Sequence, residues 1–91
     1  MTITLIREIA AEFKYEEISA ESDGLISFAK KIAKGRIRVN YWDNAQLLFL
    51  SISKEQKGFH NFKQTYPTIK YNLVYEIFKH PNRFRRHDIN R

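Results

Sequence analysis

One segment with strict alternation of side chains constrains the fold more than any other feature of this 91-residue chain. In GRIRVNYW, residues 35–42, every second residue is apolar, and the apolar residues are Ile37, Val39 and Tyr41. A period of two is typical of a β-strand that has one face in a core. The turn-forming pair Asp43 and Asn44 follows, and then a second apolar segment, AQLLFLSIS, residues 45–53. Together they predict a β-hairpin.

The length of the turn decides which side chains of this hairpin share a face, because successive strand residues point to opposite sides. A turn with an even number of residues places Ile37, Val39 and Tyr41 on the same face as Leu48, Leu50 and Ile52. We expect that face to lie in the core. The opposite face would then contain Arg36, Arg38, Asn40, Trp42, Leu47 and Phe49.

Two segments with helical periodicity flank the hairpin. Near the N-terminus the apolar residues at helical spacing are Leu5, Ile6, Ile9, Ala10 and Phe13, and either Thr2 or Thr4 can cap the helix. Near the C-terminus the expected stripe is Ile69, Leu73, Val74, Ile77 and Phe78. Thr68 is a suitable N-cap there, and His80-Pro81 should end that helix because proline cannot continue the hydrogen-bond ladder.

Two further segments permit more than one structure. SDGLISFAKKIAKG, residues 22–35, fits a helix between a Ser22 cap and Gly35, but GLISF within it also fits a short strand. FHNFKQTY, residues 59–66, predicts a strand or an irregular arm. The expected fold is α+β in a single domain, 1–91, with an N-terminal helix, three or four antiparallel strands and a C-terminal helix. Residues 79–91 would form a basic tail.

The net charge of +6 is unevenly distributed. Residues 1–23 contain two basic and six acidic residues, whereas residues 24–78 contain nine basic and three acidic ones. The last thirteen residues contain five basic residues and one acidic residue. Such a field favours a polyanionic partner, although a solvated basic surface is an equally ordinary explanation.

The start of the chain lacks a secretory signal, no apolar segment approaches the ~20 residues of a membrane span, and there is no cysteine, so we expect a cytoplasmic protein.

The candidate contact residues are cations interleaved with aromatic rings. Cations can neutralise phosphates, and rings can stack on unpaired bases. The candidates are Lys30, Lys31 and Lys34 before the hairpin, Arg36, Arg38 and Trp42 within it, and Arg83, Phe84, Arg85 and Arg86 near the C-terminus. The simpler interpretation is that a helix covers the second face of the hairpin and that the last residues are a solvated chain end.

Catalytic and metal-binding patterns are weak in this sequence. The three histidines, His60, His80 and His87, are twenty and seven residues apart, unlike the short spacing of most metal ligands. The three glycines are isolated, and no serine lies in a nucleophile-elbow context. We therefore expect no catalytic residues, no metal and no cofactor, and an enzyme is the less favoured interpretation.

Three blocks together resemble small uncharacterised proteins of cyanobacteria and algae: GLISF at 24–28, GRIRVNYW at 35–42 and IFKHPNRF at 77–84. Those proteins carry a Gly-Leu-Ile-Ser-Phe-like block, an Arg-Ile-Asn-Val-Tyr-Tyr strand and a helix that ends in Asn-Pro-Arg. Their Gly-Lys-Thr-Gln-Leu-Phe-Arg-Arg block has only GFHNFKQ, from Gly58, as its counterpart here. The resemblance implies no function. It implies that Leu25–Ala29 is a strand beside the hairpin and that Lys30–Lys34 is the turn.

Two functions fit these features. The first is a small, non-catalytic nucleic-acid-binding module, and the order helix, three strands, helix is also similar to the double-stranded-RNA-binding domain. That domain has a basic cluster at the start of its second helix. The corresponding segment of this chain, TIKYNLVYE, residues 68–76, has one lysine. The alternative is a protein-interaction module, such as a small virus-encoded inhibitor that binds an acidic surface of a host enzyme. An exposed hairpin edge could also pair with a second copy in a homodimer.

Overall fold

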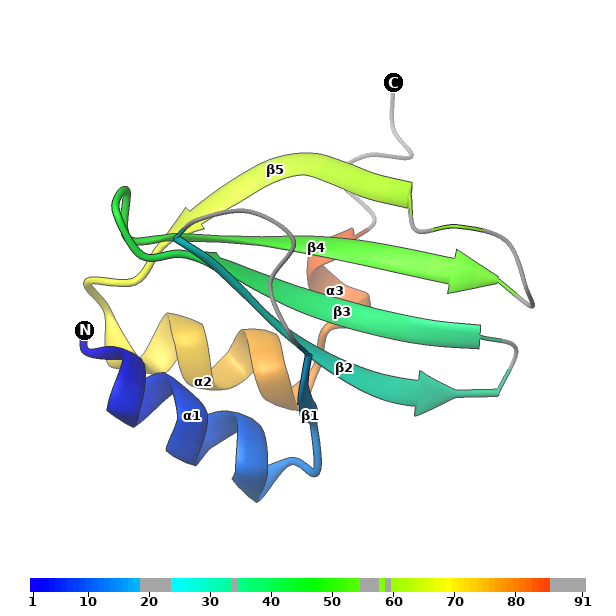
Figure 1. The fold of residues 1–91 in the computed structure, drawn as a ribbon, viewed down its shortest axis with the longest axis horizontal. Helices are drawn as coiled ribbons and strands as arrows, with labels where there is room; N and C mark the ends of the chain where they lie inside the picture. Colours follow the sequence, from blue (N-terminus) through cyan, green and yellow to red (C-terminus); the bar gives the residue numbers. More distant parts are fainter. Residues whose placement is uncertain (19–23, 34, 55–57, 59, 86–91) are drawn as a thin grey trace.

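Five strands and three helices make up the part of the chain that the computed structural model describes, which is residues 1–18, 24–33, 35–54, 58 and 60–85 (Figure 1). In chain order the elements are α1 (Ile3–Glu12), β1 (Glu16–Ile18), β2 (Leu25–Ile32), β3 (Gly35–Trp42), β4 (Leu47–Lys54), β5 (His60–Pro67), α2 (Tyr71–Lys79) and α3 (Asn82–Arg85). This order confirms the α+β class. It corrects the number of strands, which is five rather than three or four.

All five strands form one antiparallel sheet in which each strand lies beside its neighbour in sequence. β3 is the central strand, and Val39 lies opposite Phe28 of β2 and Leu50 of β4. The turn between β3 and β4 contains the four residues 43–46, and four is an even number. As expected for an even turn, the apolar residues of β3 and β4 therefore share one face of the sheet.

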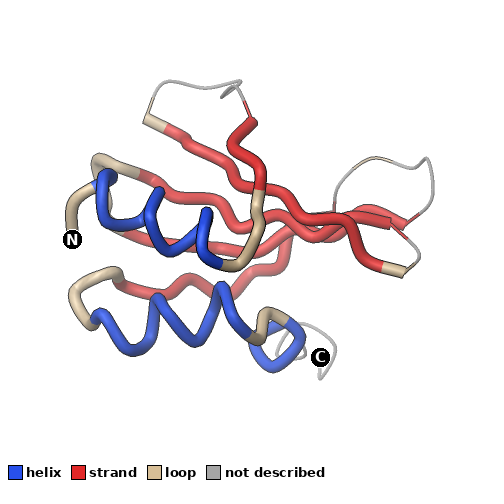
Figure 2. The backbone as a smooth tube through the Cα atoms, turned by 90° about the horizontal axis from the view of Figure 1, so that it is seen from below, coloured by secondary structure: helices blue, strands red, loops and turns tan. Residues whose placement is uncertain are grey.

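Both long helices pack on that apolar face. Figure 2 shows α1 and α2 side by side against the same side of the sheet. The residues that are at most 2% exposed include Ile6 and Ile9 of α1, Ile37, Val39 and Tyr41 of β3, Leu48 and Leu50 of β4, and Val74, Ile77 and Phe78 of α2. The joint burial of Ile37, Val39, Leu48 and Leu50 was predicted and is confirmed.

Aromatic edge-to-face contacts connect the helices to the sheet. The ring of Phe78 in α2 lies 5.1 Å from that of Tyr15 and 5.8 Å from that of Phe28, both at steep interplanar angles. The Tyr15 hydroxyl donates a hydrogen bond to the Phe78 carbonyl oxygen at 2.9 Å. α1 begins after Thr2, whose side-chain oxygen accepts from the Leu5 amide at 3.3 Å. One of the two expected N-caps is thus confirmed.

The segment that fitted either a helix or a strand is β2. It extends to Ile32, three residues beyond the expected strand Leu25–Ala29, so most of the expected turn is strand. All eight residues of β2 pair with β3, and Phe28 is buried under α2. Long-range pairing thus overrides the helical preference of a segment that contains Ala29 and Lys30.

The second helix begins later than its apolar pattern predicts. Thr68 is not its N-cap: the position before Tyr71 is Lys70, and no side chain caps the helix there. Thr68 is instead fully buried, where its amide and its hydroxyl both donate to the Gln46 carbonyl oxygen. Ile69, expected in the apolar stripe, lies outside the helix and is 82% exposed. The two hydrogen bonds of Thr68 to Gln46, in the β3–β4 turn, keep residues 68–70 out of the helix.

Part of the expected basic tail is folded onto the body. The α2 helix ends at Lys79 before His80 and Pro81, as predicted, and α3 follows at once. The half-buried Phe84 packs edge-to-face on Tyr66, with ring centroids 5.4 Å apart, and its carbonyl accepts from the Tyr66 hydroxyl at 2.8 Å. Residues 86–91 lie outside the described chain.

Gly35 is required by the close approach of β3 to β4. Its φ of +151° is accessible essentially to glycine alone, and a Cβ there would overlap the Ser53 carbonyl oxygen. We expect Gly35→Ala to lower the free energy of unfolding by about 3 kcal/mol or more, measured by urea denaturation. The matched control is Gly58→Ala, because a Cβ at Gly58 would meet nothing within 4 Å. Equal stability of the two variants would contradict the β3–β4 pairing.

Burial raises the pKa of the Tyr15 hydroxyl, so the folded protein keeps this proton at a pH where the unfolded chain releases it. Unfolding above about pH 10, the ordinary tyrosine pKa, therefore releases a proton, and the stability of the fold should decrease as the pH rises. We expect Tyr15→Phe to be less stable at neutral pH, because the Phe78 carbonyl loses its donor, but to lose stability less steeply above pH 10. Urea denaturation at pH 7 to 11 tests this, and parallel pH profiles would contradict it.

Candidate functional site

The candidate site is the face of the sheet opposite α1 and α2, here named the open face. Among the described residues no helix lies on it, as both views show (Figures 1 and 2). The simpler interpretation, that a helix covers this second face of the hairpin, is therefore wrong for the described part of the chain. Its side chains include Glu16 and Ile18 of β1, Leu25, Ser27, Ala29 and Lys31 of β2, Arg36, Arg38, Asn40 and Trp42 of β3, Leu47, Phe49, Ser51 and Ser53 of β4, and Asn61 and Thr65 of β5.

One end of the open face is apolar and aromatic. The rings of Trp42 and Phe49 stack with centroids 6.3 Å apart and an interplanar angle of 26°. Leu25 and Leu47 are the strand partners of Trp42 on either side, and all four side chains are half-buried. The Trp42 and Phe49 rings thus form a small hydrophobic platform that keeps part of its surface in solvent.

A chain of side-chain hydrogen bonds crosses the middle of the open face. The Ser27 hydroxyl donates to Asn40 Oδ1 at 2.7 Å, and Asn40 Nδ2 donates to Ser51 Oγ at 2.8 Å. The Ser51 hydroxyl then donates to Asn61 Oδ1 at 2.7 Å. This ladder joins β2, β3, β4 and β5 in turn, and its Ser27, Asn40 and Ser51 members are at most 3% exposed. These hydrogen bonds therefore link four strands across a face on which no described helix lies.

The other end of the open face is cationic. Lys31 of β2 lies directly opposite Arg36 of β3, and Arg38 follows two residues further along the same side of β3. Like charges directly opposite each other in a sheet are destabilising. Among the described residues, neither Lys31 nor Arg36 forms an ion pair, so no carboxylate of this part of the chain neutralises them.

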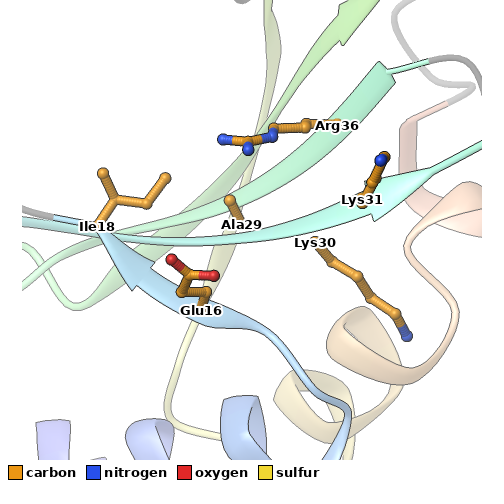
Figure 3. A pocket seen from close by; sticks show the side chains of 6 residues that line it. All are labelled: Glu16, Ile18, Ala29, Lys30, Lys31 and Arg36. Atoms are coloured by element: carbon orange, nitrogen blue, oxygen red, sulfur yellow. The ribbon is translucent and has the colours of Figure 1, made fainter.

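A pocket of about 200 Å³ opens at this cationic end. In Figure 3, Arg36 and Glu16 lie on either side of Ala29, and Ile18 lies beside them. Lys31 completes the group from the β2 edge. The pocket therefore combines positive charge with a single carboxylate, from three neighbouring strands.

The structure divides the predicted contact residues into separate groups. Lys31, Arg36, Arg38 and Trp42 share the open face. Lys30 points to the helix side, as Figure 3 shows, with its Nζ atom 5.5 Å from the centroid of the Tyr15 ring. Only part of Lys30 therefore lines the pocket.

The two C-terminal candidates whose side chains are described, Arg83 and Phe84, do not join the open face. Phe84 packs on Tyr66 at the margin of the core, and Arg83 lies 3.6 Å from Glu76 of α2 in an exposed ion pair. The backbone of Arg85 ends α3. Lys34 and Arg86 lie outside the described residues.

Sequence reasoning missed several contributors to this face, among them Glu16, Ile18 and Asn61. The first two belong to β1, whose three residues are too few to show an alternation. Asn61 lies beside a bulge, where three residues of β5 stand opposite Leu50 of β4, so the period of two is interrupted. No sequence signal marks β1, whereas the weak alternation in residues 59–66 did indicate a strand.

The histidines and acidic residues of the described chain do not gather into a metal site. The described residues contain no group of three or more His, Asp or Glu side chains that could hold a metal ion. His60 is exposed and packs edge-to-face on Phe62, and the half-buried His80 ends α2. None of the described helices is long and apolar enough to cross a membrane.

Comparisons with known proteins found no matching family model, no matching curated protein and no matching solved structure. The resemblance to cyanobacterial and algal proteins therefore stays a prediction. The observations on the open face are the basis for any functional conclusion.

The hydrogen-bond ladder predicts that Asn40 is a major determinant of stability. Asn40→Leu would leave the buried Ser27 hydroxyl without its acceptor, at a cost of about 1–3 kcal/mol for an unsatisfied group, and would remove one of the two partners of the Ser51 hydroxyl, which keeps its bond to Asn61. Replacing the partners as well, in Ser27→Ala/Asn40→Leu/Ser51→Ala, should recover most of that loss, because removing all partners together can be nearly neutral. Urea denaturation of the single and triple variants tests this. A single variant as stable as the wild type would rule the ladder out as a stabilising element.

Proposed function

We propose that this protein binds single-stranded nucleic acid on the open face of its sheet, without catalysis. The observation that supports the proposal most is that one surface, on which no described helix lies, combines the Trp42–Phe49 ring platform with the cations Lys31 and Arg36. Sheets that bind single strands use the same two elements, because rings stack on bases and cations neutralise phosphates.

The platform favours single strands over duplexes. In a duplex each base is already stacked on its neighbours, and a flat protein surface meets mainly the phosphates. A single strand can turn its bases toward the half-exposed rings of Trp42 and Phe49, and each stacked base contributes about 1–3 kcal/mol. Two rings that already stack on each other also form a preorganised surface that loses little freedom on binding.

The dimensions of the open face suit a short segment of nucleic acid. Arg36 and Trp42 are six residues apart on β3, and a strand rises about 3.3 Å per residue, so they are about 20 Å apart. At about 3.4 Å per stacked nucleotide this span corresponds to roughly six nucleotides, and to fewer in a more extended strand. Such a length lies within the usual site sizes of sheet-based single-strand binders, about 4–16 nucleotides.

The cations of the open face are distant from most of the acidic residues near the N-terminus. Most acidic residues of the first eighteen lie on the helix side or at the β1 edge: Glu8, Glu12 and Glu17 are exposed, and Glu17 pairs with Arg7 at 2.8 Å. Lys31, Arg36 and Arg38 lie on the opposite side. These cations attract a polyanion to the open face, and the acidic side chains near the first helix repel it locally. Lys30, Lys70 and Lys79 add positive charge on the helix side.

Trp42 is the single tryptophan of the chain, so its fluorescence reports directly on this surface. We expect oligothymidine and oligouridine of about ten nucleotides to quench it at low salt. Affinity should fall with salt, and two or three neutralised phosphates on a single strand give a slope of log affinity against log salt of about −1.4 to −2.1. A labelled oligonucleotide in an anisotropy assay gives the same affinities for variants that lack the tryptophan.

Matched aromatic variants distinguish the two sides of the molecule. Trp42→Ala should weaken binding about tenfold or more, because a base loses its stacking partner. Tyr71→Ala is the control, since Tyr71 is 45% exposed and its ring stacks on Tyr75 of the same helix. If no oligonucleotide binds at low salt, or if duplexes bind equally well, the proposal is wrong. The absence of all oligonucleotide binding would favour the alternative, an interaction module that presents the same cations to an acidic protein surface.

A further inference from the structure

We infer that the pocket of Glu16, Ile18, Ala29, Lys31 and Arg36 binds a terminal phosphate monoester, so that the open face captures the end of a strand. This inference rests on the proposed function, and it adds to that function a defined subsite. It is carried by the size of the pocket, by the arrangement of its cations and by the position of its one carboxylate.

The size of the pocket selects a small anion. Its volume of about 200 Å³ is below the range of about 300–1,000 Å³ that is usual for drug-sized ligands. It holds several water molecules, so a phosphate group with part of its hydration shell fits, whereas a whole nucleotide does not. The Ala29 side chain is too small to fill the space between β1 and β3, and this leaves the depression.

The cations of the pocket suit a doubly charged group. Lys31 and Arg36 lie opposite each other and, within the described chain, have no ion-pair partner. A phosphate monoester carries a charge of about −1.5 to −2 at pH 7, whereas each internal phosphodiester carries one negative charge. The guanidinium of Arg36 can donate two parallel hydrogen bonds to its oxygens. A monoester therefore relieves the Lys31–Arg36 repulsion more fully than a diester would.

Glu16 gives the pocket a means of selection. Its carboxylate faces the same space as Arg36, without an ion pair between them (Figure 3). A carboxylate repels a fully ionised anion, but it can accept a hydrogen bond from a phosphate that still carries a proton. The second pKa of a phosphate monoester is about 6, so about half of it carries that proton at pH 6 and about a tenth at pH 7. Sulfate carries no such proton, and Glu16 should therefore disfavour it.

The first experiment uses inorganic phosphate and sulfate on the ¹⁵N-labelled protein. At equal ionic strength near pH 6.5, phosphate should shift the amide resonances of Glu16, Ala29 and Arg36, and sulfate should shift them less. Glu16→Gln should remove the preference for phosphate, because the amide no longer repels sulfate. Phosphate that leaves these resonances unchanged, or sulfate that binds the wild type as well as phosphate does, would overturn the inference.

The second experiment compares one oligonucleotide sequence with a 5′-phosphate, a 3′-phosphate or no terminal phosphate. One phosphorylated form should bind about tenfold more tightly than the unphosphorylated form, as expected for charge-assisted hydrogen bonds to one group. The form that gains affinity identifies the end. Arg36→Ala should abolish this difference. Lys70→Ala, which removes an exposed lysine at the start of α2, should preserve it.

The two proposals can fail separately. Trp42→Ala should weaken all three oligonucleotides while the difference between them remains, because the ring platform is at the other end of β3. Oligonucleotides that bind the open face with no preference for a terminal phosphate would overturn the pocket and leave the proposed function standing. Shifts with inorganic phosphate in a protein that binds no oligonucleotide would overturn the nucleic-acid function and support an anion site alone.

Discussion

The pairing of β3 with both of its neighbours in a single register is the constraint on which the rest of the structure depends. Because Val39 lies opposite Phe28 and Leu50, the large apolar side chains that are buried in the three central strands all fall on one side. Only that side can bury α1 and α2, so both helices pack there. A register shifted by one residue would bring Arg36 and Arg38 under the helices, at the large cost of burying charge. The same constraint that forms the core therefore also collects cations and rings on the open face.

A sheet with helices on one side only must stabilise its other face by different means. Here the middle of that face contains small polar residues whose hydrogen bonds run from Ser27 through Asn40 and Ser51 to Asn61. Each bond joins adjacent strands, so the ladder adds cross-strand stabilisation without another layer. The Trp42 platform and the pocket beside Arg36 lie at opposite ends of this face.

Sequence alternation predicted the parts of this fold that depend on a single repeating pattern. The hairpin, its even turn and the faces of Arg36 and Trp42 follow from a period of two over eight residues. β1 could not be found in this way, because three residues show no period, and with it the carboxylate of Glu16 was missed. Lys30 and Lys31 look equivalent in the sequence, yet strand geometry sends one toward Tyr15 and the other to the open face. Thr68 fits an N-cap locally, but its hydrogen bonds to the distant Gln46 decide its structure.

The short length of β1 affects how readily the edge of the sheet could pair with a strand of another molecule. β1 pairs with Ser27, Phe28 and Ala29 only, so in the described chain no strand covers that side of β2 from Lys30 to Ile32. Uncovered sheet edges can recruit strands from other molecules, and proteins commonly prevent this by placing lysines there. Lys30 and Lys31 occupy this edge, one on each face of the sheet. Loss of these two charges would therefore endanger solubility as well as any recognition of anions, and that double demand limits how freely either position can vary.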